Sequence, residues 1–136
     1  MQTFRKKPYL IERLISAVTY LSAGGVGFLW LLIAALLKKQ VTKFVMYHVM
    51  QSIFISILFY LLSVFANFIL IIVYKIPIIN IVPYLFNMPI AMFFNLSIIQ
   101  LFTTLIILYL SITAALGYYS YLPWISDIVK INTGQR

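Results

Sequence analysis

Residues 44–74 read FVMYHVMQSIFISILFYLLSVFANFILIIVY, a run that contains no Asp, Glu, Lys or Arg. A helix needs about 20 apolar residues to cross the hydrocarbon core of a bilayer. This run is long enough for one complete crossing, and Lys43 and Lys75 flank it. The stretch therefore predicts a membrane-spanning helix over 44–74, and it suggests lipid as the solvent for the rest of the chain.

The composition of the whole chain agrees with this prediction. Hydrophobic residues make up 64% of the 136 residues and charged residues only 9%, with a mean hydropathy of +1.06. A soluble domain is about half apolar and about a quarter charged, and a chain of 15.7 kDa has too small an interior to hide this much Leu, Ile and Phe. We therefore predict an all-α integral membrane protein, a small helical bundle with residues 1–136 as a single membrane domain.

Two further uncharged intervals lie on either side of the 44–74 run. Residues 14–37 are long enough for one crossing, but they contain Ala-Gly-Gly-Val-Gly at 23–27, and glycine permits sharp bends. The interval after Lys75 contains Pro77, Pro83 and Pro89 in its first part, and proline lacks a backbone donor and ends or kinks helices. We predict a kinked, proline-rich interfacial or re-entrant piece over 76–94, a second full span over 95–118, and a cytoplasmic or stromal tail over 119–136.

The distribution of positive charge favours a bent first segment. Ten Lys and Arg against two Asp and Glu give a net charge of +8, and basic loops prefer the cytoplasmic side of a membrane. If residues 14–37 crossed as one straight helix, the basic residues would be divided equally between the two sides. If the segment bends at 23–27 and returns, only Lys75 lies apart from the others. We therefore predict a helical hairpin, with both termini on the cytoplasmic or stromal side.

Polar side chains recur at helical spacing along both predicted spans. Spacings of three, four and seven residues place each set on one helix face. The first stripe is His48, Ser52, Ser56, Tyr60, Ser63 and Asn67, and the second is Ser97, Gln100, Thr104 and Ser111. The two stripes are either a hydrophilic seam that something polar crosses or ordinary packing surfaces. Packing is the commoner role, because hydroxyl side chains support close contacts between membrane helices.

The residue types argue against catalysis, metal binding and nucleic-acid binding. No ionisable carboxylate or amine lies deep in a predicted span, where coupled transporters place such groups. One histidine without any cysteine does not make a metal site, and no nucleophile elbow or phosphate-binding glycine loop is present. The basic residues stand in short groups beside apolar runs and form no dense basic face. We predict a protein that is not an enzyme, binds no cofactor and binds no nucleic acid.

Four polar residues mark the point where the first span is predicted to meet the membrane surface. They are Lys43, Tyr47, His48 and Gln51. Tyr and Lys are typical of membrane interfaces, so His48 is expected to be an interfacial anchor. The alternative is a ligand-binding or pH-sensing role, because an imidazole titrates at about pH 6.5.

Three local patterns resemble those of one known family. FVMYHVMQ at 44–51 resembles a signature that reads Phe-Val-Arg-Phe-Asn and then a Met-Gln pair, and Glu12-Arg13 resembles an acidic-basic pair ahead of the first helices. GYYSYLPWISD at 117–127 resembles a closing Gly-x-Tyr … Pro-x-Ile-Ser-Asp. The family is the twenty-kilodalton membrane component of the chloroplast inner-envelope protein translocon (TIC), with its bacterial and plastid-encoded relatives. Met46 and His48 depart from its pattern, which has a basic residue and Asn there.

The resemblance implies a subunit of a membrane protein-translocation complex, which contributes helices to a polypeptide path or scaffold. It implies a plastid inner envelope or bacterial inner membrane, with other membrane-protein subunits, membrane lipids and a polypeptide substrate as partners. Two alternatives stay open: a structural or assembly subunit of another membrane complex, and a small self-assembling pore.

We expect contacts with partners or with the interface from residues at the ends of the predicted spans. They are Arg13, Lys43, Phe44, Tyr47, His48, Gln51, Pro123 and Asp127. Asp127 is expected either to pair with Arg13 or Lys43 on the same side or to remain solvated, since exposed ion pairs add only about 0–1 kcal/mol.

Overall fold

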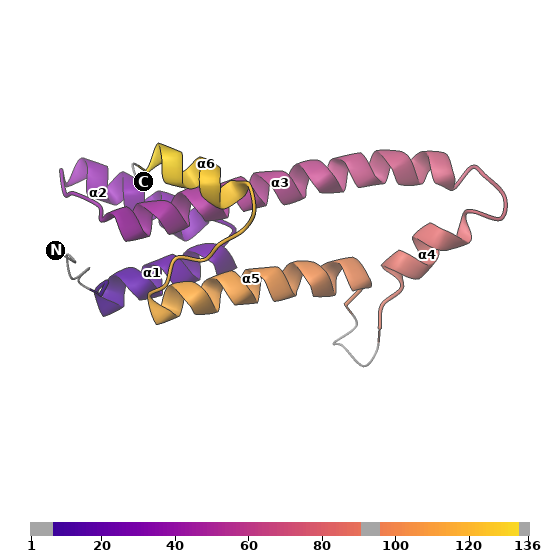
Figure 1. Cartoon of the computed structure of the whole chain (residues 1–136). Helices are drawn as coiled ribbons and strands as arrows, with labels where there is room; N and C mark the ends of the chain where they lie inside the picture. Colours follow the sequence, from indigo (N-terminus) through magenta and orange to yellow (C-terminus); the bar gives the residue numbers. More distant parts are fainter. Residues whose placement is uncertain (1–6, 91–95, 134–136) are drawn as a thin grey trace. The chain divides into compact units, whose positions relative to one another are not determined.

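The structure is a computed structural model that describes residues 7–90 and 96–133 (Figure 1). Its helices are α1 (Leu10–Leu21), α2 (Gly25–Leu36), α3 (Lys43–Val73), α4 (Ile81–Asn87), α5 (Ile98–Leu116) and α6 (Ile125–Asn132). Apart from one isolated bridge between Ile90 and Leu96, the described residues form no β-structure. The prediction of an all-α chain is therefore confirmed for this part of the sequence.

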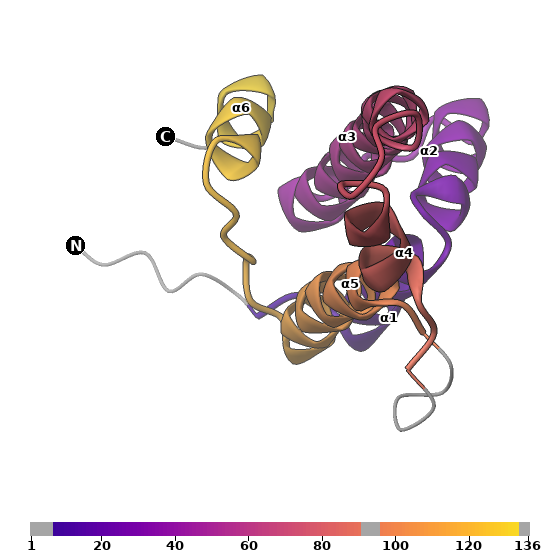
Figure 2. The same ribbon diagram turned by 90° about the vertical axis from the view of Figure 1, so that its right-hand side faces the viewer.

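The chain packs as two compact units, and α3 and α5 each contribute to both. The first unit combines the chain up to Ser56 with the chain from Leu108 onward, so it holds α1, α2, the first turns of α3, the last turns of α5, and α6. The second unit is Ile57–Ile107, which holds the rest of α3, α4 and the beginning of α5. In the first unit, α2 and α6 lie on opposite sides of α3 (Figure 2).

α1 and α2 form a helical hairpin, and the predicted bend at 23–27 is confirmed. α1 ends at Leu21, Ala23 and Gly24 take positive φ values of 52° and 91°, and α2 begins at Gly25. Glycine tolerates such a φ because it has no Cβ to meet the backbone. Each helix has 12 residues, which makes it about 18 Å long against a hydrocarbon core of about 30 Å. Neither helix alone is long enough to cross a bilayer.

Small side chains allow the hairpin to pack closely on α3. A Cβ added to Gly27 would lie 2.6 Å from Cγ2 of Thr19 on α1 and 2.6 Å from Cγ2 of Val49 on α3. Three helices therefore meet at a point that only glycine fits. Next to it lies a small apolar core of Phe44, Val45 and Val49, against which Ile15, Leu31, Val41 and Ile53 pack.

α3 and α5 are two helices of sufficient length and hydropathy to cross a membrane. α3 has 31 residues, about 46 Å, and α5 has 19 residues, about 28 Å. α5 ends in a Schellman motif: Gly117 has a φ of 85°, its N–H donates to Ala114, and the N–H of Tyr118 donates to Thr113. The helix thus stops two residues before the end of the predicted 95–118 span, because glycine takes the left-handed conformation there.

The proline-rich segment is interrupted, as its sequence predicts. After α3 the chain turns, with Ile78 at a φ of 78°, and then forms only the seven residues of α4, which include Pro83. Residues 91–95, which belong to the predicted 76–94 piece and to the start of the predicted last span, lie outside the described residues. α4 is too short to cross a bilayer.

Candidate functional site

The first unit buries polar side chains and exposes apolar ones. On α1, Ser16, Thr19 and Tyr20 are buried, whereas Leu14 and Leu21 are 53% and 61% exposed. The buried polar residues of the described chain are Ser16, Thr19, His48, Gln51, Ser52, Ser97, Ser111, Ser120 and Ser126. In proteins that fold in water, Ser, Thr and Gln are mostly exposed and Leu is most often inside. Here buried polar side chains share the interior with apolar ones such as Val45, Val49 and Leu110, while many Leu, Ile and Phe side chains face outward.

Six of the inward-facing residues form a hydrogen-bonded group, which we call the polar cluster. Its members are Tyr20, Tyr47, His48, Gln51, Ser120 and Ser126. They come from α1, from the first turns of α3, from the irregular segment after α5, and from α6, which lies alongside those turns (Figure 1). The cluster thus joins parts of the chain that are far apart in sequence.

Gln51 is the centre of the polar cluster, and all of its hydrogen-bonding capacity is used. Its Oε1 accepts from the hydroxyl of Tyr20 at 2.6 Å and from that of Ser120 at 2.8 Å. Its Nε2 donates to Oγ of Ser126 at 3.0 Å and to the carbonyl oxygen of Ser120 at 3.4 Å. A carbonyl only accepts, so the nitrogen and not the oxygen of the amide must face it. The cluster therefore fixes the orientation of the Gln51 amide.

The protons of the cluster can be assigned from the same contacts. The amide oxygen of Gln51 has no proton, so the single phenolic proton of Tyr20 lies in their 2.6 Å contact. Nδ1 of His48 lies 2.8 Å from the same phenolic oxygen and must therefore be the donor. In a neutral imidazole the lone pair is then on Nε2. The backbone of Tyr118 also interacts with this ring, but no hydrogen bond of good geometry reaches the buried Nε2.

His48 lies inside the first unit, although the sequence predicts it at the membrane surface. Its side chain is fully buried, and the ring of Phe44 lies 4.5 Å away, that of Tyr47 5.3 Å and that of Tyr20 5.7 Å, centroid to centroid, all in edge-on contact. Tyr119, which follows α5, adds a parallel ring at 6.0 Å. Part of the cover over His48 therefore comes from the far end of the sequence, which local sequence patterns around His48 cannot show.

The cluster also satisfies the backbone of the irregular segment 117–124. The carbonyl oxygen of Ser120 accepts from the hydroxyl of Tyr47 at 2.6 Å, and the N–H of Leu122 donates to Oγ of Ser126 at 2.7 Å. Non-helical backbone that is shielded from water needs such partners, because an unpaired N–H or C=O is costly. The cluster therefore holds this segment against α3. Residues 119–133, predicted as part of a tail, belong to the first unit and contain α6.

α1 and the end of α5 run antiparallel and exchange two hydrogen bonds. Nε of Arg13 donates to the carbonyl oxygen of Ala115 at 2.7 Å, and Oγ of Ser111 donates to that of Ala17 at 3.1 Å. A cation at the last turn of a helix is favourable, because the carbonyl end carries partial negative charge. Asp127 instead accepts from the hydroxyl of Tyr121 at 3.4 Å, so Arg13 and Asp127 have different partners. Of the other predicted contact residues, Lys43 and Pro123 are exposed.

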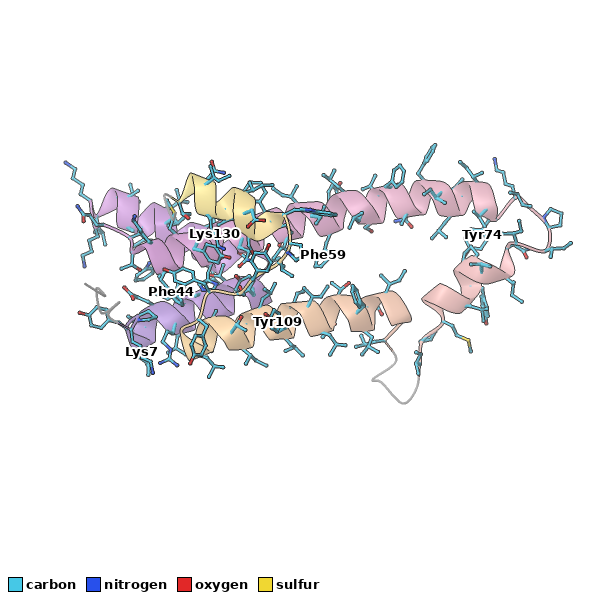
Figure 3. All side chains as sticks on the ribbon, in the orientation of Figure 1. Lys7, Phe44, Phe59, Tyr74, Tyr109 and Lys130 are labelled. Atoms are coloured by element: carbon cyan, nitrogen blue, oxygen red, sulfur yellow. The ribbon has the colours of Figure 1, made fainter. Side chains whose placement is uncertain are left out.

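The first polar stripe divides between the two units. Ser52 donates to Val49 of its own helix, and Ser56 donates to Ser52 and to the carbonyl oxygen of Ala23 in the hairpin turn, at 3.0 Å. Farther along α3, in the second unit, Tyr60, Ser63 and Asn67 are all exposed. Side chains project from this part of α3 all along its length (Figure 3). The stripe therefore has an internal half and an outward half.

The second polar stripe bonds mostly within its own helix. Thr104 donates to the carbonyl oxygen of Gln100, and Oε1 of Gln100 accepts from the N–H of Ser97. Only Ser111 reaches another helix, through Ala17 of α1. Among the described residues, no hydrogen bond joins the two stripes.

Sequence reasoning misses three of the six cluster residues: Tyr20, Ser120 and Ser126. One signal was available for Tyr20, because Ser16, Thr19 and Tyr20 fall on one face of α1 at helical spacing. No local signal selects Ser120 and Ser126, because their partners Tyr47 and Gln51 lie about seventy positions earlier in the chain.

No protein-family model, curated protein or solved structure matches this chain. The resemblance to the translocon family stays a prediction. No group of three or more His, Cys, Asp or Glu with the placement of a metal site lies among residues 7–90 and 96–133. What the chain does must therefore be argued from its surface and its polar cluster.

Proposed function

We propose that this chain is a helical integral membrane protein and a non-catalytic subunit of a larger membrane complex. The apolar exterior carries the proposal: Leu, Ile and Phe side chains cover the outside of both units, while the polar side chains of Gln51 and His48 are fully buried. An exterior of this kind is stable only where lipid or other protein replaces water. α3 and α5 are the proposed crossings, and the α1–α2 hairpin is proposed to enter the membrane and return.

The ends of the helices in the first unit support a common side for both termini. Because α1 and α2 are joined by a tight turn, the beginning of α1 and the end of α2 lie at the open end of the hairpin, with Lys38 and Lys39 directly after it. The bond from Arg13 to Ala115 brings the end of α5 to the same end. Basic groups collected at one end favour the cytoplasmic or stromal side.

The outward half of the first polar stripe supports a partner subunit. Tyr60, Ser63 and Asn67 are exposed on a helix that we propose to be surrounded by lipid. Hydroxyl and amide groups gain little from lipid and gain hydrogen bonds, each of about 0.6–2 kcal/mol, from a neighbouring helix. We therefore propose that this face of α3 packs against another subunit.

We propose that the complex is a protein translocon of a plastid inner envelope or bacterial inner membrane, the class that the resemblance names. Three patterns that carry the resemblance are in mutual contact. Gln51 of the first signature bonds Ser126 of the closing motif, and the ring of Phe44 lies 5.4 Å from that of Tyr119. Arg13 of the acidic-basic pair lies against Gly117: its Nε is 3.3 Å from the position that a Cβ on Gly117 would take. If the family members share one helix packing, the residues that contact one another in it are the ones that they would keep in common.

A structural subunit of some other membrane complex is the second candidate. One observation favours it: Gln51 has no unused hydrogen-bonding group, and Ser52 and Ser56 bond within the unit. Gln51, Ser52 and Ser56 therefore have little left to offer a passing polypeptide. In this case the polar stripes are packing surfaces only.

Site-specific crosslinking in the native membrane tests the proposal. The chain has no cysteine, so Ser63→Cys carries the only thiol for a short crosslinker. Phe65→Cys, on the opposite side of the same stretch of α3 and also exposed, is the matched control. We expect Ser63→Cys to capture a discrete partner and Phe65→Cys to capture none.

The identity of the captured partner separates the candidates. Mass spectrometry that finds translocon or preprotein components supports the translocon, and an unrelated stoichiometric partner supports the second candidate. Capture of another copy of this chain alone, together with ion conductance of the purified protein, would instead support a self-assembling pore. Equal capture from both positions, or from neither, would contradict a partner on this face of α3.

A further inference from the structure

α6 buries one face in the first unit, and within residues 7–90 and 96–133 its opposite face is largely exposed. Ser126 and Val129 are fully buried on the inner face. Trp124, which directly precedes the helix, Ile128 and Ile131 are 83%, 46% and 80% exposed. The i, i+3 spacing of Ile128 and Ile131 places them on one side of the helix, roughly opposite the inner face, and Trp124 stands exposed at its N-cap position. We call Trp124, Ile128 and Ile131 the outer stripe.

Polar and charged groups lie along one flank of the outer stripe. Nζ of Lys130 stands 5.1 Å from the centre of the Tyr121 ring, a cation–π distance, and the hydroxyl of Tyr121 lies 3.4 Å from Oδ2 of Asp127. The helix therefore presents an indole and two isoleucines with a cation and a carboxylate beside them. Helices with this division of side chains lie in the plane of a membrane interface.

The position of α6 in the chain points to the same surface. α5, one of the two helices proposed to cross the membrane, ends at Leu116, and the aromatic residues Tyr118, Tyr119, Tyr121 and Trp124 follow within eight positions. Tyr and Trp are enriched where a membrane meets water. The end of a crossing and a run of aromatic residues thus place the membrane boundary near this segment.

We propose that the outer stripe of α6 inserts into the boundary between headgroups and acyl chains, with Lys130 directed to anionic headgroups. The inference rests on the proposed membrane location of the chain. It adds an interfacial anchor, α6, which does not cross the bilayer and is not a solvated tail. A protein partner fits the stripe less well. Three side chains on an eight-residue helix supply far less than the roughly 800 Å² per partner of a stable protein interface, whereas a bilayer surface requires no minimum area.

The two tryptophans of the chain allow a direct test. Trp30→Phe leaves Trp124 as the only indole, and Trp124→Phe leaves Trp30 on α2. Each variant is reconstituted into vesicles of phosphatidylcholine and phosphatidylglycerol that carry bromine atoms either close to the headgroup or near the end of the acyl chain. We expect the shallow bromines to quench Trp124 at least about twofold more strongly than the deep ones, because an interfacial helix sits about 5–10 Å into the boundary.

The outcomes separate this inference from the proposal on which it rests. Quenching of Trp30 but not of Trp124 would overturn the interfacial helix and leave the membrane protein intact. Quenching of Trp124 mainly by the deep bromines would also overturn the interfacial helix. So would protection of Trp124 from both the bromines and aqueous iodide, because that result means that protein covers the indole. Absence of quenching for both indoles would contradict the membrane location itself.

A third variant, Trp30→Phe with Ile128→Ser and Ile131→Ser, tests the two isoleucines of the outer stripe. It should lose most of the quenching of Trp124 by the shallow bromines, and unchanged quenching would contradict a role for the stripe.

Discussion

The phenolic oxygen of Tyr20 on α1 lies 2.6 Å from Oε1 of Gln51 on α3. Gln51 bonds in turn to Ser126 of α6, so one amide connects the amino-terminal hairpin, the first long helix and the carboxy-terminal helix. The exterior of this unit is apolar, and apolar contacts alone do not specify which helix faces pack together. Buried hydrogen bonds of this kind do specify the arrangement, because each needs a particular partner.

Removal of the Tyr20 hydroxyl should destabilise the first unit. Tyr20→Phe leaves the buried Nδ1–H of His48 without its acceptor and takes one donor from Gln51, which we expect to cost about 1–3 kcal/mol of unfolding free energy. Unfolding in mild detergent, followed by circular dichroism, measures the change. Tyr109→Phe, at a half-exposed tyrosine of the same fold, should change stability by less than about 0.5 kcal/mol. Equal effects at the two positions would contradict the role of the Tyr20 bond.

The hairpin glycines should respond differently to the same substitution. In Gly27→Ala the new Cβ would stand 2.6 Å from Thr19 and Val49, so α1, α2 and α3 must move apart at a cost of about 1–3 kcal/mol. In Gly25→Ala nothing lies within 4 Å of the new Cβ, and the change should be neutral or slightly stabilising, because alanine favours the helix. Thermal unfolding of both variants in one detergent compares them. A neutral Gly27→Ala would show that the three helices do not meet as described.

Loss of the Gln51 amide should release the carboxy-terminal segment. Gln51→Leu removes both donors that reach Ser126 and the carbonyl of Ser120, so residues 117–132 should open more often and exchange their amide hydrogens faster. Hydrogen–deuterium exchange with mass spectrometry reads this segment directly. Gln100→Leu is the control, because among the described residues that exposed side chain bonds to Ser97, which directly precedes its own helix. If exchange over 117–132 is the same in both variants, the cluster does not hold the segment.

The two amide substitutions of His48 should rank by which ring nitrogen they imitate. The side-chain amide of asparagine reaches the position of Nδ1, which bonds to Tyr20, whereas that of glutamine reaches the position of Nε2, which has no partner. We expect His48→Asn to destabilise the protein less than His48→Gln, because it keeps the buried hydrogen bond. Unfolding free energies of the two variants decide the order. The reverse order would mean that the proton assignment in the cluster is wrong.

Single cysteines should report a returning hairpin. Lys7→Cys and Lys39→Cys precede and follow α1 and α2, and Lys75→Cys follows α3; all three positions are exposed. With a membrane-impermeant maleimide added to sealed vesicles, we expect the first two to react from one side and Lys75→Cys from the other. Reaction of Lys7→Cys and Lys39→Cys from opposite sides would mean that residues 14–37 cross completely.

Local sequence signals were sufficient for α1, α2, α3 and α5, but not for α6, which lies in the predicted tail. The glycines at 23–27 break the first apolar segment where α1 ends and α2 begins, and the uncharged run after Lys43 forms one long helix. Both outcomes depend on properties of neighbouring residues: a backbone without Cβ at the turn, and a long stretch without glycine or proline to break the helix. The same kind of signal places Gly117 at the end of α5, where its positive φ closes the helix.

The partners of the polar residues depended on the tertiary structure alone. The sequence shows a polar stripe that begins at His48, with Gln51 nearby. It does not show that the ring of Tyr119 covers His48, or that Gln51 bonds to Ser120 and Ser126. Helical periodicity tells which side chains share a face, whereas the group that meets this face depends on how segments about seventy residues apart dock. By itself the sequence determined an apolar helical chain, its helix breaks and its charge asymmetry. Only the tertiary structure decided that the polar groups turn inward, because each buried donor and acceptor needs a partner that a distant part of the chain supplies.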